Sequence, residues 1–134
     1  MIETGTLARR AVVAAAIVAT ACGAVAETIE RQLRVGARER SYEIDLPARH
    51  DRDRPLPVVI VFHGGGGSAD SVRRQSRLSA KGETEGFIAV YPQGSGGIAD
   101  KLKTWNAGTC CGQAMQQRVD ETAFVAALLD MHCQ

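Results

Sequence analysis

An apolar run that ends in a histidine and four glycines is the part of the sequence with the clearest chemical potential. Residues 58–62 read Val-Val-Ile-Val-Phe, and His63 and Gly64–Gly67 follow directly. Glycines that follow a buried strand let the backbone bend sharply and approach a ligand closely. At the head of a helix their N–H groups can receive negative charge. In acyl transfer, that charge is the oxyanion of the tetrahedral intermediate.

Other glycine-rich loops fit this stretch less well. A phosphate-binding loop is disfavoured because no Gly-Lys-Ser/Thr follows the glycines. The dinucleotide fingerprint fits poorly, since Asp70 stands where its third glycine should be. A tight or flexible turn without chemistry is the remaining alternative.

The sequence contains no serine with the surroundings of an acyl-transfer nucleophile, which has glycine two residues before and after it. Ser95 has Gln93 before it, and Ser68 has Asp70 after it. Neither serine follows a buried strand and opens a helix. His132 is expected to end a helix, where a cation favours the dipole. We therefore expect no catalytic residue in this sequence.

The elements that position the loop follow from hydrophobic periodicity. Residues 28–35 and 40–46 alternate between apolar and polar side chains around Gly36–Ala37, which predicts an antiparallel hairpin with one wet face. Residues 57–63 and 86–91 are continuously apolar and predict buried strands. The segments 68–81 and 120–131 predict helices, the first capped by Ser68 or Asp70.

The order of these elements predicts the fold class. A hairpin followed by strand, helix, strand and helix indicates an α/β protein with parallel strands and right-handed crossovers. The apolar face of the last helix should carry Phe124, Leu128 and Met131, with Asp120 as its cap. Residues 93–112 form a long glycine-rich loop that holds Trp105. A loop of that length is typically functional or stapled.

Residues 1–26 resemble an export signal. Arg9 and Arg10 precede an apolar run, and Ala24-Val-Ala26 matches a cleavage site. A buried or transmembrane helix is the weaker alternative, because the run is short for a bilayer. Arg9-Arg10 is only a weak twin-arginine signal, and Cys22 is a candidate lipid anchor. We expect a secreted or periplasmic protein whose domain spans residues 27–134.

The cysteines are expected to meet an oxidising compartment, where disulfides form. Cleavage would remove Cys22, or lipidation would occupy it. The neighbours Cys110 and Cys111 are not expected to bridge each other, because that geometry is strained. One of them is expected to pair with Cys133, and the other with a cysteine outside this sequence. A zinc site is a weaker alternative, because the sequence lacks a Cys-x-x-Cys pair.

The overall composition excludes some classes of partner. The 134 residues are 45% hydrophobic and 4% aromatic. The low aromatic content argues against base-stacking platforms. Without residues 1–26 the acidic and basic side chains balance, so no basic face for nucleic acid or an anionic membrane is expected.

The sequence from residue 28 onward resembles the secreted polyhydroxybutyrate depolymerase and feruloyl esterase family. The motifs that carry the resemblance are Arg40-Ser-Tyr42, Leu46-Pro47, the run 58–68, the segment 86–94, Trp105-Asn-Ala-Gly, Cys110-Cys-Gly and Val119-Asp-Glu-Thr-Ala-Phe124. The resemblance implies an α/β-hydrolase fold and a Ser-His-Asp carboxylic ester hydrolase that needs no metal or cofactor.

Individual roles carry over from this family by position. Gly64, Gly65 and Gly66 match its oxyanion loop, and Gly65 or Gly66 is the expected N–H donor. His63 is expected to hold the loop through its ring rather than to act as the base. Trp105 is a candidate for the substrate cleft, with plain packing as the alternative. Asp120 is interpreted as a helix cap rather than a catalytic acid.

The resemblance also implies what this chain lacks. In the family, the nucleophile elbow follows the helix that matches residues 120–131. The chain is therefore expected to be the N-terminal part of such a domain, inactive alone, with its sheet incomplete. The substrate would be a polyester, or a plant cell-wall ester such as a feruloyl ester or acetylated xylan. The alternative is a secreted binding module without catalysis.

Overall fold

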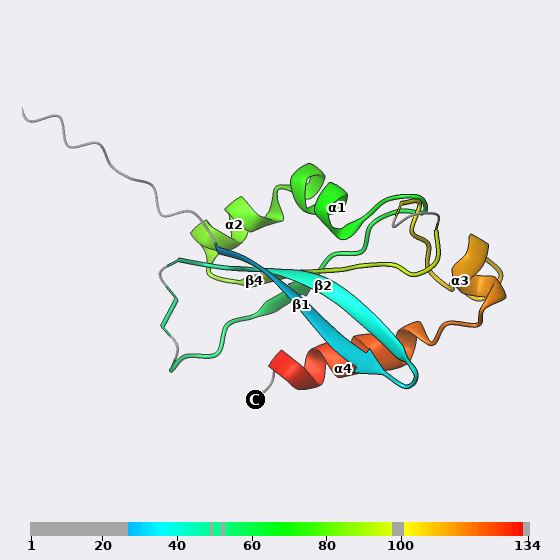
Figure 1. Ribbon diagram of the computed structural model, residues 1–134. Coiled ribbons are helices and arrows are strands. Elements are labelled where there is room, and N and C mark those ends of the chain that lie inside the picture. The colour runs from blue at the N-terminus through cyan, green and yellow to red at the C-terminus, as the bar shows by residue number, and fades with distance from the viewer. Residues whose placement is uncertain (1–26, 49, 52, 98–100, 133–134) are drawn as a thin grey trace, which may run out of the picture.

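A mixed sheet forms the centre of the computed structural model, which describes residues 27–48, 50–51, 53–97 and 101–132 (Figure 1). The expected export signal, Cys22 and Cys133 lie outside the described residues. The strands are β1 (Glu27–Val35), β2 (Arg38–Leu46), β3 (Val58–Ile60) and β4 (Ile88–Pro92). The helices are α1 (Ala69–Ser76), α2 (Leu78–Glu85), α3 (Gly112–Gln116) and α4 (Glu121–His132).

The strands lie in the order β1-β2-β4-β3. β1 and β2 form the expected antiparallel hairpin, with Ile29 opposite Ile44. β2 also pairs antiparallel with β4, while β3 pairs parallel with β4 and places Val59 opposite Ala89. The predicted combination of an antiparallel hairpin with parallel strands is therefore confirmed. β3 is the outer strand on the side away from the hairpin.

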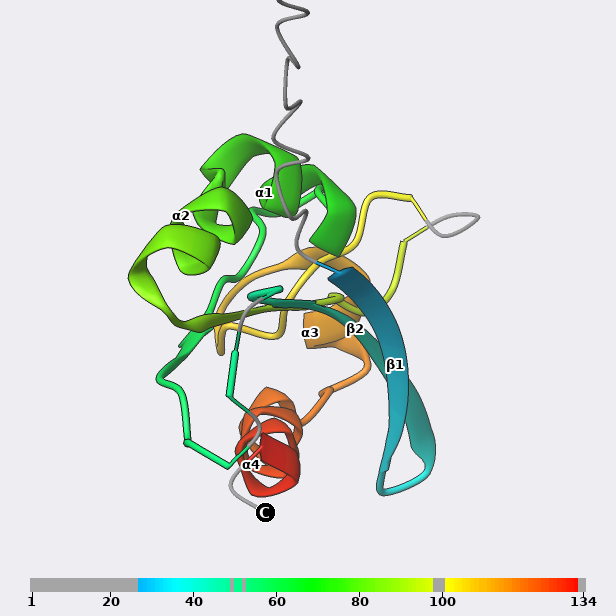
Figure 2. The same ribbon diagram turned by 90° about the vertical axis from the view of Figure 1, so that its left-hand side faces the viewer.

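Helices cover both faces of the sheet, as the two views show (Figure 2). α1 and α2 lie on one face, α4 lies on the other, and α3 lies beyond the end of β4. The predicted helix over residues 68–81 is in fact two helices, because Arg77 adopts a left-handed backbone with φ 56°. Ser68 caps α1 by accepting a hydrogen bond from the Ser71 N–H. The short helix α3 was not predicted.

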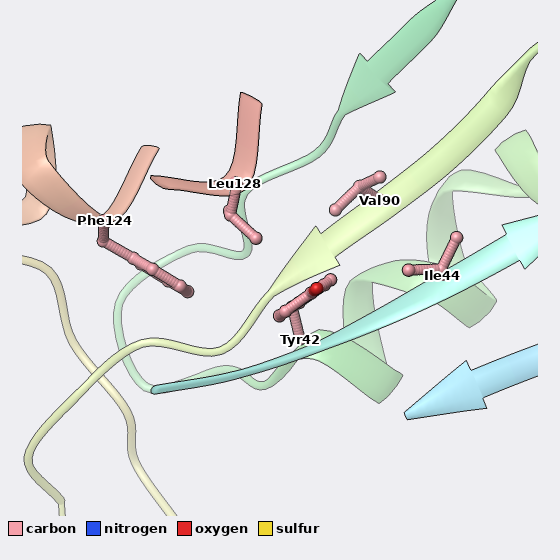
Figure 3. Close-up of a cluster of buried hydrophobic side chains, with 5 residues drawn as sticks. All are labelled: Tyr42, Ile44, Val90, Phe124 and Leu128. Carbon is pink, nitrogen blue, oxygen red and sulfur yellow. The ribbon is translucent and has the colours of Figure 1, made fainter. Parts of the chain in front are cut away.

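The core beneath the sheet is built by β2, β4 and α4. Its buried side chains are Tyr42, Ile44, Val90, Phe124 and Leu128 (Figure 3). Phe124 and Leu128 thus confirm the predicted apolar face of α4. Met131 was expected on the same face, but it is 53% exposed. The i+7 position of this face therefore meets solvent.

The opposite face of the sheet carries a polar cluster beneath α1. Arg73 pairs with Glu43 at 2.7 Å and with Asp70 at 3.3 Å. Asp45 is buried beside them, and its carboxylate oxygens accept no hydrogen bond from the described residues. Burial raises the pKa of Glu43 above its ordinary value, and the Arg73 charge offsets part of this. The interface between α1 and the sheet therefore combines this ion-paired cluster with a small apolar cluster of Ala69, Ala89 and Tyr91.

The two neighbouring leucines of α4 offer a matched test of the core. Leu128 is fully buried and Leu129 is 44% exposed on the same helix. Leu128→Ala should lower the free energy of unfolding by about 2–5 kcal/mol, because it leaves a cavity. Leu129→Ala should change it by about 0.5 kcal/mol or less. Urea unfolding of both variants measures this, and equal losses would contradict the described core.

The raised pKa of Glu43 predicts a pH-dependent stability. Between the ordinary carboxyl pKa and the raised value, the folded state binds more protons than the unfolded state. The contribution of Glu43 to stability therefore falls as pH rises through that window. Glu43→Gln removes this titration, so the stability of the native protein relative to this variant should fall with rising pH. Unfolding curves over pH 4–7 measure the difference, and a constant difference would contradict the prediction.

Candidate functional site

His63 fastens the start of the glycine loop to the end of β4. Its side chain is buried, with 3% of its surface exposed. Nε2 accepts a hydrogen bond from the Gly94 N–H at 3.0 Å. Because that nitrogen is an acceptor, Nδ1 carries the proton and donates to the Gly64 carbonyl at 2.8 Å. Both ring nitrogens are therefore used in holding the loop.

The glycine at position 94 is required by this close packing. A Cβ there would lie 2.7 Å from the Thr104 carbonyl oxygen and 2.9 Å from the His63 ring. Any larger residue would push the imidazole away from the backbone that it binds. In the sequence, Gly94 stands out only as the glycine of Pro-Gln-Gly at the end of a predicted strand. Its contact with His63 could not be predicted from that pattern.

The four glycines of the loop differ in what their N–H groups do. Gly66 donates to the Lys103 carbonyl at 2.8 Å, and Gly67 donates to the Gly64 carbonyl at 3.0 Å. The N–H groups of Gly64 and Gly65 have no hydrogen-bond partner among the described residues, and both glycines are exposed. Gly66 also has φ 82°, which an L side chain rarely adopts. The loop thus presents Gly65 to solvent while Gly66 anchors it.

Trp105 packs behind the loop. Its indole N–H donates to the His63 carbonyl at 2.9 Å. Its ring lies edge-on to Phe62, with centroids 5.2 Å apart, and tilts against His63 at 5.0 Å. These contacts give Trp105 a structural task. The expectation that it lines a substrate cleft stays a prediction.

A buried ion pair joins the elements behind Trp105. Arg40 is 4% exposed and contacts Glu121 at 2.9 Å. The same guanidinium nitrogen donates to the Gln93 carbonyl at 3.2 Å. The other carboxylate oxygen of Glu121 accepts a hydrogen bond from the Asn106 N–H at 3.1 Å. This pair was not predicted as a unit, although Arg40 stands in phase with the inward-facing Tyr42 along β2.

Asp120 begins the last helix, as predicted. Its carboxylate accepts a hydrogen bond from the Ala123 N–H at 2.9 Å, three residues along the chain. This is the contact of an N-terminal helix cap. The interpretation of Asp120 as a cap is therefore confirmed.

The neighbours Cys110 and Cys111 follow each other across a cis peptide bond, and their side chains lie in contact. Cys133 lies outside the described residues. The pairing of these cysteines therefore stays a prediction.

The described residues do not assemble a nucleophile with a base. The Ser95 hydroxyl is buried without a hydrogen-bond partner. His63 cannot activate it in this arrangement, because both its nitrogens are engaged. No three or more His, Cys, Asp or Glu side chains in this part of the chain are grouped to hold a metal ion. In the same residues, no helix has the length and apolarity to cross a membrane.

Comparison with known proteins shows an esterase-like fold. No protein-family model matches the chain. A candidate esterase, NocK from Nocardia uniformis subsp. tsuyamanensis, is 33% identical over 70 residues, which is 52% of this chain and 20% of that protein. The solved structure of a protein called FAE matches with a TM-score of 0.50 and 18% identity, over 79% of this chain and 37% of that chain.

A mutant feruloyl esterase module from Clostridium thermocellum, complexed with sinapinate, matches with a TM-score of 0.48 and 18% identity. This match covers 57% of this chain and 30% of that one. The chain thus spans about a fifth of its curated relative and about a third of the solved structures. The matched region is an α/β fold like part of an esterase domain.

Proposed function

We propose that this chain is the oxyanion-loop portion of an exported serine carboxylic ester hydrolase. The observation that carries the proposal is the glycine loop itself. It follows a strand of a mixed α/β sheet, it is held by His63, and none of the described residues accepts a hydrogen bond from the Gly65 N–H. An N–H donor fixed before the reaction is what the developing oxyanion of ester hydrolysis requires.

Gly65 is the best donor of the candidate glycines in this arrangement. Gly66 already donates to the Lys103 carbonyl, so its use would break the contact that anchors the loop. Gly64 precedes the bend and is the second choice. The proposed contribution is one half of an oxyanion hole, because the other donor follows the nucleophile in this kind of fold.

The nucleophile would have to reach this loop from a segment beside β3. β3 is the outer strand of the described sheet, and its far edge has no partner strand there. Phe62, just after β3, is 45% exposed. A further parallel strand on that edge would cover these residues and bring its carboxyl end to the glycine loop. We propose that the serine elbow follows such a strand.

The same proposal includes export and an ester substrate. Residues 1–26 would direct the protein out of the cytoplasm. The substrate class is a carboxylic ester, with polyesters, feruloyl esters and acetylated xylan as the candidates. A non-catalytic binding module is a weaker proposal, because the Trp105 ring is occupied by internal packing.

The proposal is tested by the coding sequence that follows codon 134 and by an assay. The chain of residues 27–134 alone should not hydrolyse p-nitrophenyl butyrate above background. A chain continued through an in-frame Gly-x-Ser-x-Gly should hydrolyse it, and Ser→Ala at that motif should abolish turnover. Serine-dependent turnover by residues 27–134 alone, or no such motif downstream, would overturn the proposal.

Two substitutions at Gly65 separate the backbone N–H from the loop shape. In the continued chain, Gly65→Ala keeps the N–H, and its Cβ would meet no atom within 4 Å. Gly65→Pro removes the N–H and should lower kcat by about 10²–10³. Thermal melts check that both variants fold. Equal activity of the two variants would show that this N–H is not the oxyanion donor.

Substitutions of His63 and His50, whose rings both contact backbone groups, test how the glycine loop is held in place. His63→Ala leaves the Gly94 N–H buried without a partner and should lower the free energy of unfolding by about 2–4 kcal/mol. It should also shift the emission of Trp105, the single tryptophan. His50→Ala, which loses one contact to the Pro47 carbonyl, is the control. Equal losses in the two variants would argue against a special role for His63.

A further inference from the structure

A pocket of about 200 Å³ lies between the tip of the β1–β2 hairpin and the beginning of α4. Both elements meet at the same end of the sheet in Figure 1. Three arginines line the pocket, two from β2 and one from the connection between α3 and α4. The complete lining is Val35, Ala37, Arg38, Arg40, Arg118, Val119 and Asp120.

The three arginines differ in how far the protein already uses them. Arg40 is buried and paired with Glu121, so its charge is balanced within the fold. Arg38 is exposed and gives one N–H to the Gln117 side chain at 3.0 Å, which leaves other donors open. Arg118 is exposed, and its side chain has no hydrogen-bond or ion-pair partner among the described residues. Arg38 and Arg118 are therefore available to an anion.

The backbone conformation of Arg118 favours a binding role for its side chain. Arg118 has φ 47°, in the left-handed region, and follows the end of α3. Glycine is the residue that usually occupies such a position after a helix, because it has no Cβ to clash. An arginine there accepts backbone strain that a glycine would avoid. Residues held in that way cluster at binding sites.

The rest of the lining defines what kind of anion fits. Val35, Ala37 and Val119 give the pocket an apolar floor. Asp120 adds a negative charge at the rim, although one of its oxygens is engaged by the Ala123 N–H. That negative charge repels a dianion such as phosphate more strongly than it repels a monoanion. A single carboxylate with a hydrocarbon body fits the available arginines, the apolar residues and the nearby negative charge of Asp120.

We propose that this pocket binds a short-chain monocarboxylate. Its carboxylate would receive N–H groups from Arg38 and Arg118, and its hydrocarbon chain would lie on Val35, Ala37 and Val119. Guanidinium groups suit this contact because they donate two parallel hydrogen bonds to a carboxylate. The binding needs no ester hydrolysis, so it stands or falls separately from the proposed activity.

Titration of ¹⁵N-labelled residues 27–134 with sodium butyrate, followed by NMR, tests the site. Butyrate should shift the amides of Ala37 and Val119, with a Kd of about 1–10 mM for so small a ligand. Butyramide, which has the same shape without the charge, and inorganic phosphate should each bind at least about tenfold more weakly.

Variants locate the binding. Arg38→Gln and Arg118→Gln should each weaken butyrate binding by about tenfold. Arg118→Gly should fold at least as well as the native protein, since glycine suits φ 47°, and should lose binding to the same extent. Arg34→Gln is the matched control, because Arg34 lies on the same hairpin but does not line the pocket.

Four results would each overturn the proposal. The first is a butyramide response equal to that of butyrate, which would show that charge plays no part. The second is butyrate binding that Arg118→Gly leaves unchanged in a folded protein. The third is a loss of binding in Arg34→Gln as large as that in Arg118→Gly, and the fourth is the absence of any shift at 50 mM butyrate.

Discussion

The buried pair of Arg40 and Glu121 is the interaction on which the end of the molecule with the glycine loop depends. It connects β2, the end of β4 through the Gln93 carbonyl, and the backbone of Asn106. The guanidinium also lies 4.0 Å from the centre of the Phe124 ring, in the core. Burying two charges carries a desolvation cost that such a pair does not always recover. The pair joins four segments: β2, α4, the residue after β4 and the loop at Asn106.

That arrangement determines where the glycine loop lies. The fixed segment at Asn106 places Trp105, which holds the His63 carbonyl. The ring of His63 in turn holds Gly64 on one side and Gly94 on the other. Each contact uses a backbone group that would otherwise be unpaired in a loop, and such groups are costly to bury alone. The loop therefore keeps its shape through hydrogen bonds, although glycine itself favours no single conformation.

Local pattern was enough to predict the hairpin, the two strands, the last helix and its Asp120 cap, because each of these depends on neighbours in the sequence. The break at Arg77 and the helix α3 escaped prediction, since left-handed residues other than glycine carry little signal. The Arg40–Glu121 pair and the polar cluster at Arg73 join residues far apart in the chain. The alternation of side chains along β2 could place Arg40 on the inward face, but it could not identify Glu121 as its partner.

The N–H groups of Gly65 and Gly66 differ in their hydrogen bonding, and this difference leaves the Gly65 N–H open to a ligand. Gly65 is exposed, so water can reach its N–H, and the lack of a partner among the described residues costs little. The neighbouring Gly66 N–H donates to the Lys103 carbonyl and so anchors this part of the loop. A ligand oxygen that replaced the water would then meet a donor that needs no reorganisation, the condition under which such a group stabilises a developing charge most. Substitutions that free Gly66 would add a second donor and yet loosen the first.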